Sequence, residues 1–258
     1  MKITLFTSNQ SRHNYLIKTL TSVCDELVVI QERKNFSKSS VTSHKIQSRI
    51  KNSYFNKVIK AEKKVFGISK LNKKIKIIKI KGNINNYSLN YFNGFLNSDL
   101  FIIYGSSYIK GKLLSFLRSK KAIGLHMGVS PYYRGTDCNF WATYDNKPEL
   151  VGATIYLLSR GLDDGNILFH AFPKKNKNYF IFSMLAVKSA FECLAKNIKN
   201  KRIFEVKSVK QNKKNEIRYT KISDFTDEIL KKFKSKEISL KIKKRKLYKF
   251  INSFETNE

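Results

Sequence analysis

The sequence predicts an α/β fold with a Rossmann-like open, mostly parallel sheet and helices on both of its faces. Apolar runs at residues 2–7 and 27–31 flank a helix-like segment, and strand, helix and strand at this spacing form a βαβ unit with a right-handed crossover. The apolar run at residues 100–104 predicts a central strand. Apolar residues recur at helical spacing over residues 181–198, which predicts a long amphipathic helix.

The remaining elements follow from the same patterns along the chain. Ser11 ends a polar turn and is a candidate N-cap for a helix that reaches about Leu20. Short apolar runs predict strands at residues 75–80, 122–125, 151–158, 168–172 and 202–209. Helices are expected within residues 43–64, 88–96 and 110–117, from residue 139 onwards, and within residues 218–233, where Ser223 or Thr226 is the candidate cap.

Length and charge bound the domain organisation and the class of partner. The sequence changes character near residue 200, which predicts a main domain over residues 1–200 and a small, basic, mainly helical C-terminal extension over residues 201–258. The net charge of +32 suits nucleic acid, an anionic substrate or a membrane surface. The charge is spread along the whole chain, however, which favours compositional drift as its source. The basic run at residues 241–249 either binds phosphate or forms a solvated helix face.

Several kinds of site and location are disfavoured by the sequence. Cys24, Cys138 and Cys193 are odd in number and lack metal-binding spacing, which indicates a reduced, cytoplasmic protein without a metal site. No apolar run is long enough for a signal peptide or a membrane span. No G-x-G-x-x-G follows the first strand, which argues against a dinucleotide cofactor.

Two motifs follow neighbouring apolar runs in the second half of the main domain. The first reads I-G-L-H-M-G-V-S-P-Y-Y-R-G over residues 123–135, and the second reads S-R-G-L-D-D-G-N-I-L over residues 159–168. His126 and Asp163 each come at the end of a predicted strand, where open α/β sheets place their ligand sites. The sequence therefore predicts that these two side chains face one another across a cleft.

These motifs resemble the formyltransferase family, which transfers a formyl group from 10-formyltetrahydrofolate to a primary amine. The family pattern is matched at His126, Pro131, Tyr133-Arg134-Gly135 and Gly161-Leu162-Asp163-x-Gly165. The resemblance covers roughly residues 1–198, which makes residues 1–200 a formyltransferase-like catalytic domain. One position departs from the pattern, because the Asn that the family has two residues before its His is Gly124 here.

The resemblance implies how the reacting groups act. His126 donates a hydrogen bond to the developing oxyanion, and Asp163 keeps the imidazole cationic and relays the proton of the amine. Because Gly124 has no side chain, the family's carboxamide donor is missing. Asn139 is the best available replacement, although capping its helix is an equally open role for it.

Further residues are expected to bind the two substrates. The resemblance implies a pocket for the formyl donor that is formed by Tyr104, Gly105, Ser106, Ser107, Arg160, Gly161, Leu162 and Gly165. A plain strand-to-helix turn is the alternative for the Gly-Ser-Ser segment. Asn9 and Arg12 are placed to hold an anion of the acceptor at a helix N-terminus, and Arg134 either clamps a phosphate or pairs with a carboxylate.

Four functions remain open from the sequence. The leading one is an N-formyltransferase that acts on a nucleotide-linked amino sugar or a similar small phosphorylated amine. Residues 201–258 look too short and too helical for a tRNA-binding barrel, whereas the basic charge favours a methionyl-tRNA formyltransferase-like enzyme. Gly124 favours a catalytically impaired folate- or nucleotide-binding protein on the same fold. A nucleic-acid-binding module has only the charge in its favour.

Overall fold

The computed structural model describes residues 1–33, 48–67, 75–236, 240–241 and 252–255. The strands are β1 (Lys2–Thr7), β2 (Glu26–Arg33), β3 (Lys76–Lys81), β4 (Leu100–Ile103), β5 (Ile123–His126), β6 (Tyr133–Gly135), β7 (Ala153–Leu157), β8 (Ile167–Phe172), β9 (Arg218–Thr220) and β10 (Asn252–Glu255). One sheet has the order β10-β8-β7-β5-β4-β1-β2-β3, and a second sheet pairs β6 with β9. Within the large sheet, the neighbouring strands β5, β4, β1, β2 and β3 are all parallel. β7 runs antiparallel to both β5 and β8. The predicted open, mostly parallel sheet is therefore confirmed.

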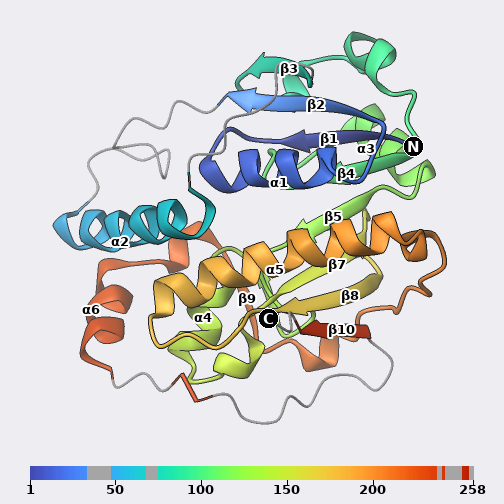
Figure 1. Cartoon of the computed structure of the whole chain (residues 1–258). Helices are drawn as coiled ribbons and strands as arrows, with labels where there is room; N and C mark the ends of the chain where they lie inside the picture. The colour runs from blue at the N-terminus through green and yellow to red at the C-terminus, as the bar shows by residue number, and fades with distance from the viewer. Residues whose placement is uncertain (34–47, 68–74, 237–239, 242–251, 256–258) are drawn as a thin grey trace.

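Helices cover both faces of the large sheet. The α-helices are α1 (Ser11–Thr21), α2 (Arg49–Phe66), α3 (Gly111–Ser119), α4 (Cys138–Tyr144), α5 (Tyr179–Lys199) and α6 (Asp227–Ser235). Short 3-10 helices lie at Ile84–Asn86, Leu89–Phe95, Pro148–Leu150, Arg202–Phe204, Lys213–Asn215 and Ile222–Asp224. Helices α1 and α5 lie on the face that Figure 1 turns to the viewer, and α3 lies behind the sheet. In the described part of the chain no helix is long and apolar enough to cross a membrane.

The alternation of side chains along β1 explains the two layers. Ile3 and Leu5 are fully buried on one face, where they join a core with residues of α1 and α5. Phe6 points to the other face and joins a second core that contains Leu117 of α3. Because successive strand residues point to opposite faces, one apolar run supplies both cores.

The C-terminal residues pack onto the main sheet and its neighbours. β9 pairs with β6 directly after the His126 loop, and β10 pairs in parallel with β8. Thr226 caps α6 by accepting a hydrogen bond from the backbone N–H of Ile229, as one of the two alternatives for this helix predicted. The hydroxyl of Ser48 at the start of α2 donates to Asp227 of α6 at 2.6 Å. α6 is thereby held beside α2, as Figure 1 shows.

Some local predictions differ from the structure. The segment at 202–209 is not a strand, because Lys201 turns the chain with φ +59° and only Val209 forms a bridge, to Ile167. The helix expected within residues 88–96 is present and is a 3-10 helix over Leu89–Phe95. The N-cap of α1 is Gln10, not Ser11. The first residues of the expected 43–64 helix and nearly all of the 241–249 run lie outside the described residues.

Candidate active site

A cavity of about 1090 Å³ opens at the carboxyl ends of β4 and β5. Its polar lining residues include His126 at the end of β5, Asp163 in the turn after β7 and Asn139 of α4. Its aromatic side is formed by residues of α2, α4 and α5 and of the C-terminal segment, namely Tyr54, Phe55, Phe140, Tyr179, Phe180 and Phe225. A mostly apolar cavity of this size with a few converging polar groups is typical of a small-molecule site.

His126 and Asp163 form an ion pair at this cavity. His126 is the last residue of β5, and its Nδ1 lies 3.1 Å from Oδ2 of Asp163. Only 6% of the His126 side chain and 12% of the Asp163 side chain are exposed. The structure thus brings together the two side chains that the motifs singled out.

His126 and Asp163 stabilise each other's charged forms, although burial disfavours both charges. Burial acts to lower the pKa of His126, but the Asp163 carboxylate outweighs it and raises that pKa well above its ordinary value. Burial acts to raise the pKa of Asp163, but the His126 charge and the hydrogen bonds it receives bring that pKa below its ordinary value. His126 is therefore an imidazolium and Asp163 a carboxylate near neutral pH. The second ring nitrogen of His126, Nε2, lies 3.2 Å from the carbonyl oxygen of Tyr133.

The turn that carries Asp163 is held in place from two sides. Asp163 has φ +51°, in the left-handed region that Asp and Asn tolerate better than most residues. The hydroxyl of Tyr156 donates to Oδ1 of Asp163 at 3.0 Å. Gln211 Nε2 donates to the backbone oxygens of both Asp163 and Gly165 at 2.8 Å. Tyr156 and Gln211 were not singled out by the sequence, because neither belongs to a motif.

Arg134 braces the same turn. Its Nη2 donates to the carbonyl oxygen of Leu162 at 2.9 Å, and its Nη1 pairs with Glu216 at 2.8 Å. Its guanidinium lies 5.3 Å from the ring centre of Tyr219. Of the two roles that the sequence left open for Arg134, pairing with a carboxylate is the one present in the structure.

Asn139 lies in α4 at the wall of the cavity. It is 3% exposed, and its Oδ1 accepts a hydrogen bond from the backbone N–H of Gly152 at 3.0 Å. Its Nδ2 is buried without a hydrogen-bond partner among the described residues. Among the described residues, no hydrogen bond joins Asn139 to His126. That Asn139 takes the place of the family's missing carboxamide therefore stays a prediction.

The Gly-Ser-Ser turn after β4 is shaped by packing. A Cβ at Gly105 would overlap the ring of His13, and Gly105 has φ +67°. Gly105 and Ser106 line the cavity, as Tyr104 does. Ser107 does not line it, because its N–H and its hydroxyl both donate to the buried Glu32, at 2.7 and 3.1 Å.

The two residues expected to hold an anion have different surroundings. Arg12 lines the cavity, and its backbone N–H and its Nη1 both donate to Glu62, at 3.0 and 2.6 Å. Its Nε is buried without a partner among the described residues. Asn9 does not line the cavity, and its Oδ1 accepts from the hydroxyl of Ser8 at 3.3 Å.

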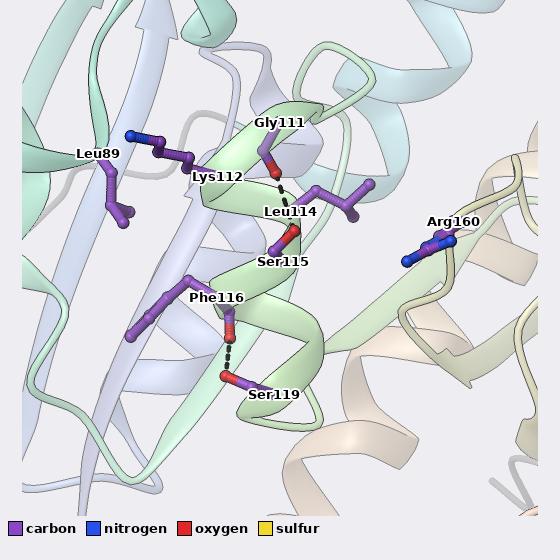
Figure 2. A pocket seen from close by; sticks show the side chains of 8 residues that line it. All are labelled: Leu89, Gly111, Lys112, Leu114, Ser115, Phe116, Ser119 and Arg160. Carbon is purple, nitrogen blue, oxygen red and sulfur yellow. Dashed lines mark hydrogen bonds between the residues drawn. The ribbon is translucent and has the colours of Figure 1, made fainter.

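Of the turn from Arg160 to Gly165, Asp163 is the residue that lines the cavity, so the expected contacts of Arg160, Gly161, Leu162 and Gly165 with the formyl donor stay predictions. The Arg160 side chain lines a second hollow, of about 890 Å³, beside α3. Figure 2 shows its guanidinium pointing toward Leu114 of α3. The carbonyl oxygen of Arg160 accepts from the hydroxyl of Tyr108. A Cβ at Gly165 would overlap the carbonyl oxygen of Leu157, so this turn can approach β7 only through a glycine.

The part of the chain that the structure describes holds no candidate metal site. Within the described ranges, no group of three or more His, Cys, Asp or Glu side chains is arranged to hold a metal ion. Cys24, Cys138 and Cys193 are free thiols. Cys138 lies at the cavity, where burial raises the pKa of its thiol.

Comparison with known proteins yields matches to solved structures. No family model matches the chain, and no curated protein sequence matches it. An N-formyltransferase from Helicobacter canadensis, solved with folinic acid and dTDP-3-aminofucose, matches with TM-score 0.57 and 17% identity over 90% of this chain and 79% of that one. A formyltransferase from Anoxybacillus kamchatkensis, solved with a UDP-linked formamido sugar and tetrahydrofolate, matches with TM-score 0.50 and 18% identity over 87% of both chains. A phosphoribosylglycinamide formyltransferase from Anaplasma phagocytophilum matches with TM-score 0.50 and 16% identity over 77% of this chain and 84% of that one.

These matches agree with the α/β architecture of the described residues. The match to the Helicobacter canadensis enzyme covers 90% of this chain. At identities of 16–18% the likeness establishes architecture and not substrate. The resemblance that the two motifs indicated is confirmed at the level of the fold: this chain has the fold of the formyltransferases.

Proposed function

We propose that this protein is an N-formyltransferase that moves a formyl group from 10-formyltetrahydrofolate to the primary amine of a nucleotide-linked amino sugar. The observation that carries the proposal is the buried His126–Asp163 ion pair, with its atoms 3.1 Å apart, at the wall of a cavity large enough for two substrates. An ion pair of this kind supplies both a donor for an oxyanion and an acceptor for a proton.

The chemistry of formyl transfer requires those two services. The neutral amine attacks the formyl carbon, a carbon–nitrogen bond forms, and the formyl oxygen gains negative charge. The bond from that carbon to the folate nitrogen then breaks, the amine gives up a proton, and the departing nitrogen takes one up. The imidazolium of His126 stabilises the oxyanion, and the Asp163 carboxylate accepts the proton of the amine.

The position of His126 Nε2 adds a step to this scheme. Without substrate, the N–H at Nε2 has the carbonyl oxygen of Tyr133 as its acceptor, at 3.2 Å. A formyl oxygen in the cavity offers a better acceptor once it becomes negative, because charged hydrogen bonds are stronger than neutral ones. His126 therefore exchanges a backbone acceptor for the oxyanion as the charge develops.

In this proposal Tyr104, Gly105 and Ser106, which line the cavity, hold the pterin of the formyl donor, and Arg12, which also lines it, binds the acceptor. The turn from residue 160 to 165 adds Asp163 to the cavity wall. The Helicobacter and Anoxybacillus enzymes were both solved with a folate and a nucleotide-linked sugar, which supports this pair of ligands. The Arg134 guanidinium, engaged by Glu216 and Leu162, serves the catalytic turn instead of a phosphate.

The test is a transfer assay with three acceptors and one formyl donor. Purified protein is incubated with 10-formyltetrahydrofolate and either a dTDP-linked amino sugar, glycinamide ribonucleotide or methionyl-tRNA, and mass spectrometry detects the formylated product. We expect the sugar nucleotide to be formylated, and the rate to fall at least about a hundredfold in His126→Ala. Efficient formylation of methionyl-tRNA, with binding that weakens steeply as salt rises, would overturn the choice of acceptor. No binding of tetrahydrofolate at high micromolar concentration in calorimetry would count against the formyl donor.

A further inference from the structure

Gly124 and Tyr156 face each other across two antiparallel strands. The register of β5 against β7 pairs Gly124 with Tyr156, and directly opposed residues place their side chains on the same face of a sheet. A Cβ at Gly124 would lie 2.7 Å from the Tyr156 hydroxyl oxygen and would overlap the ring carbon that carries it. The ring of Tyr156 therefore takes the space that any side chain at residue 124 needs.

The hydroxyl of Tyr156 reaches the reacting pair. It donates to Oδ1 of Asp163 at 3.0 Å, while the other carboxylate oxygen, Oδ2, lies 3.1 Å from His126 Nδ1. Tyr156 is 7% exposed, and burial raises the pKa of its hydroxyl well above the ordinary value, so it stays a donor at neutral pH. The two oxygens of one carboxylate are thus assigned to two different donors.

We propose that Tyr156 is a positioning residue of this site, which replaces a side chain at residue 124 and orients the Asp163 carboxylate toward His126. This role rests on the proposed function, because the pair that it orients is the reacting pair. It also means that Gly124 does not mark a damaged site. Tyr156 can occupy this position only because residue 124 is a glycine, since a Cβ there would overlap the Tyr156 ring.

The hydroxyl and the ring make separable contributions. The hydroxyl favours the ionised form of Asp163, because a hydrogen bond to a carboxylate stabilises its charge. The ring fills the volume above Gly124, as aromatic residues do when they cover a glycine on a neighbouring strand. A role in packing alone predicts that only the ring matters.

Tyr156→Phe tests the hydroxyl, because it keeps the ring. We expect kcat to fall by about tenfold to a hundredfold with little change in KM, the range for losing a hydrogen bond to a charged group. We also expect the pKa of Asp163 to rise, which moves the acidic limb of the kcat–pH profile to higher pH. The matched control is Tyr15→Phe, which removes a hydroxyl that donates to Glu192 at the same distance, 3.0 Å, outside the cavity. The control is expected to leave the profile unchanged.

Substitutions at residues 124 and 156, alone and together, test whether the two positions compete for the same space. Gly124→Ala is expected to lower Tm by about 3–10 °C in the native background, because overpacking a buried site strains it. In the Tyr156→Ala background the same change is expected to have little effect on Tm. The double variant with Gly124→Asn and Tyr156→Ala should recover turnover relative to Tyr156→Ala alone, because it returns a polar side chain to the vacated space.

One readout separates this proposal from the proposed function. The imidazole pKa of His126, followed by NMR, requires no turnover, and it should fall in Tyr156→Phe because a carboxylate that the hydroxyl no longer orients turns Oδ2 away from Nδ1. An unchanged His126 titration together with a native kcat–pH profile would overturn the positioning role. A protein that formylates none of the acceptors but shows the His126 shift and the Tm coupling would refute the proposed reaction and leave the Tyr156–Asp163–His126 linkage standing.

Discussion

Replacing Asp163 with Asn removes the negative charge that lies 3.1 Å from His126 Nδ1 and keeps nearly the same shape. Unit charges at this distance interact by about 5 kcal/mol at an effective dielectric constant of about 20. Burial of the pair offsets much of that energy, because each buried ion loses several kcal/mol of hydration. We therefore expect the His126 pKa to fall by about 1–3 units, the usual effect of a close opposite charge.

NMR titration of ring-labelled histidine measures this shift directly. The chain has four histidines, and His126→Gln identifies the signal of His126. His170 is an internal control, because burial lowers its pKa to about 3 and it stays neutral through the titration. Turnover should fall by at least about a hundredfold in Asp163→Asn, since the variant cannot accept the proton of the amine. A His126 pKa within about half a unit of the native value would refute the ion pair as the source of its charge.

The shifted pKa values of His126 and Asp163 also predict how the free energy of unfolding depends on pH. The raised pKa of His126 contributes stability that is complete below about pH 6.5 and is lost as pH rises through the raised value. The lowered pKa of Asp163 contributes stability that is present above about pH 3.9 and is lost as pH falls through the lowered value. The free energy of unfolding of the native protein should therefore exceed that of Asp163→Asn most between about pH 4 and 6.5. Urea unfolding of both proteins across this pH range measures the difference in their free energies of unfolding. A difference that grows steadily toward alkaline pH would contradict this prediction.

Two further variants probe the walls of the site. Asn139→Ala removes a buried Nδ2 donor at the cavity and should lower kcat about tenfold at similar KM; unchanged turnover in steady-state kinetics would confine Asn139 to packing of α4. Glu216→Gln leaves the guanidinium of Arg134 without its carboxylate and should lower Tm by about 3–10 °C, because a hydrogen bond between charged groups is lost. Because Arg134 also holds the carbonyl of Leu162, KM for the formyl donor should rise as well, and a lower Tm with unchanged KM would limit Arg134 to the fold.

The sequence by itself determined the class of fold and singled out the two side chains, His126 and Asp163, that pair at the cavity. Apolar runs of strand length and the helical period of residues 181–198 are local signals, and they survive in β1, β2, β4 and α5 because each element buries its own apolar face. His126 and Asp163 were found for a similar reason. Each stands in a short motif that also contains the glycines its turn requires, so the chemistry and the backbone are encoded together.

Only the tertiary structure decided how the pair is supported and which side chain occupies the space beside Gly124. Tyr156 meets Gly124 because β7 runs antiparallel to β5, and no local pattern encodes the direction or the register of that pairing. From the C-terminal segment, Gln211 reaches the Asp163 turn, 48 residues away along the chain, and Glu216 pairs with Arg134, 82 residues away. A hydrogen bond depends on where two groups lie in space, whereas hydrophobic periodicity depends only on the spacing of residues along the chain.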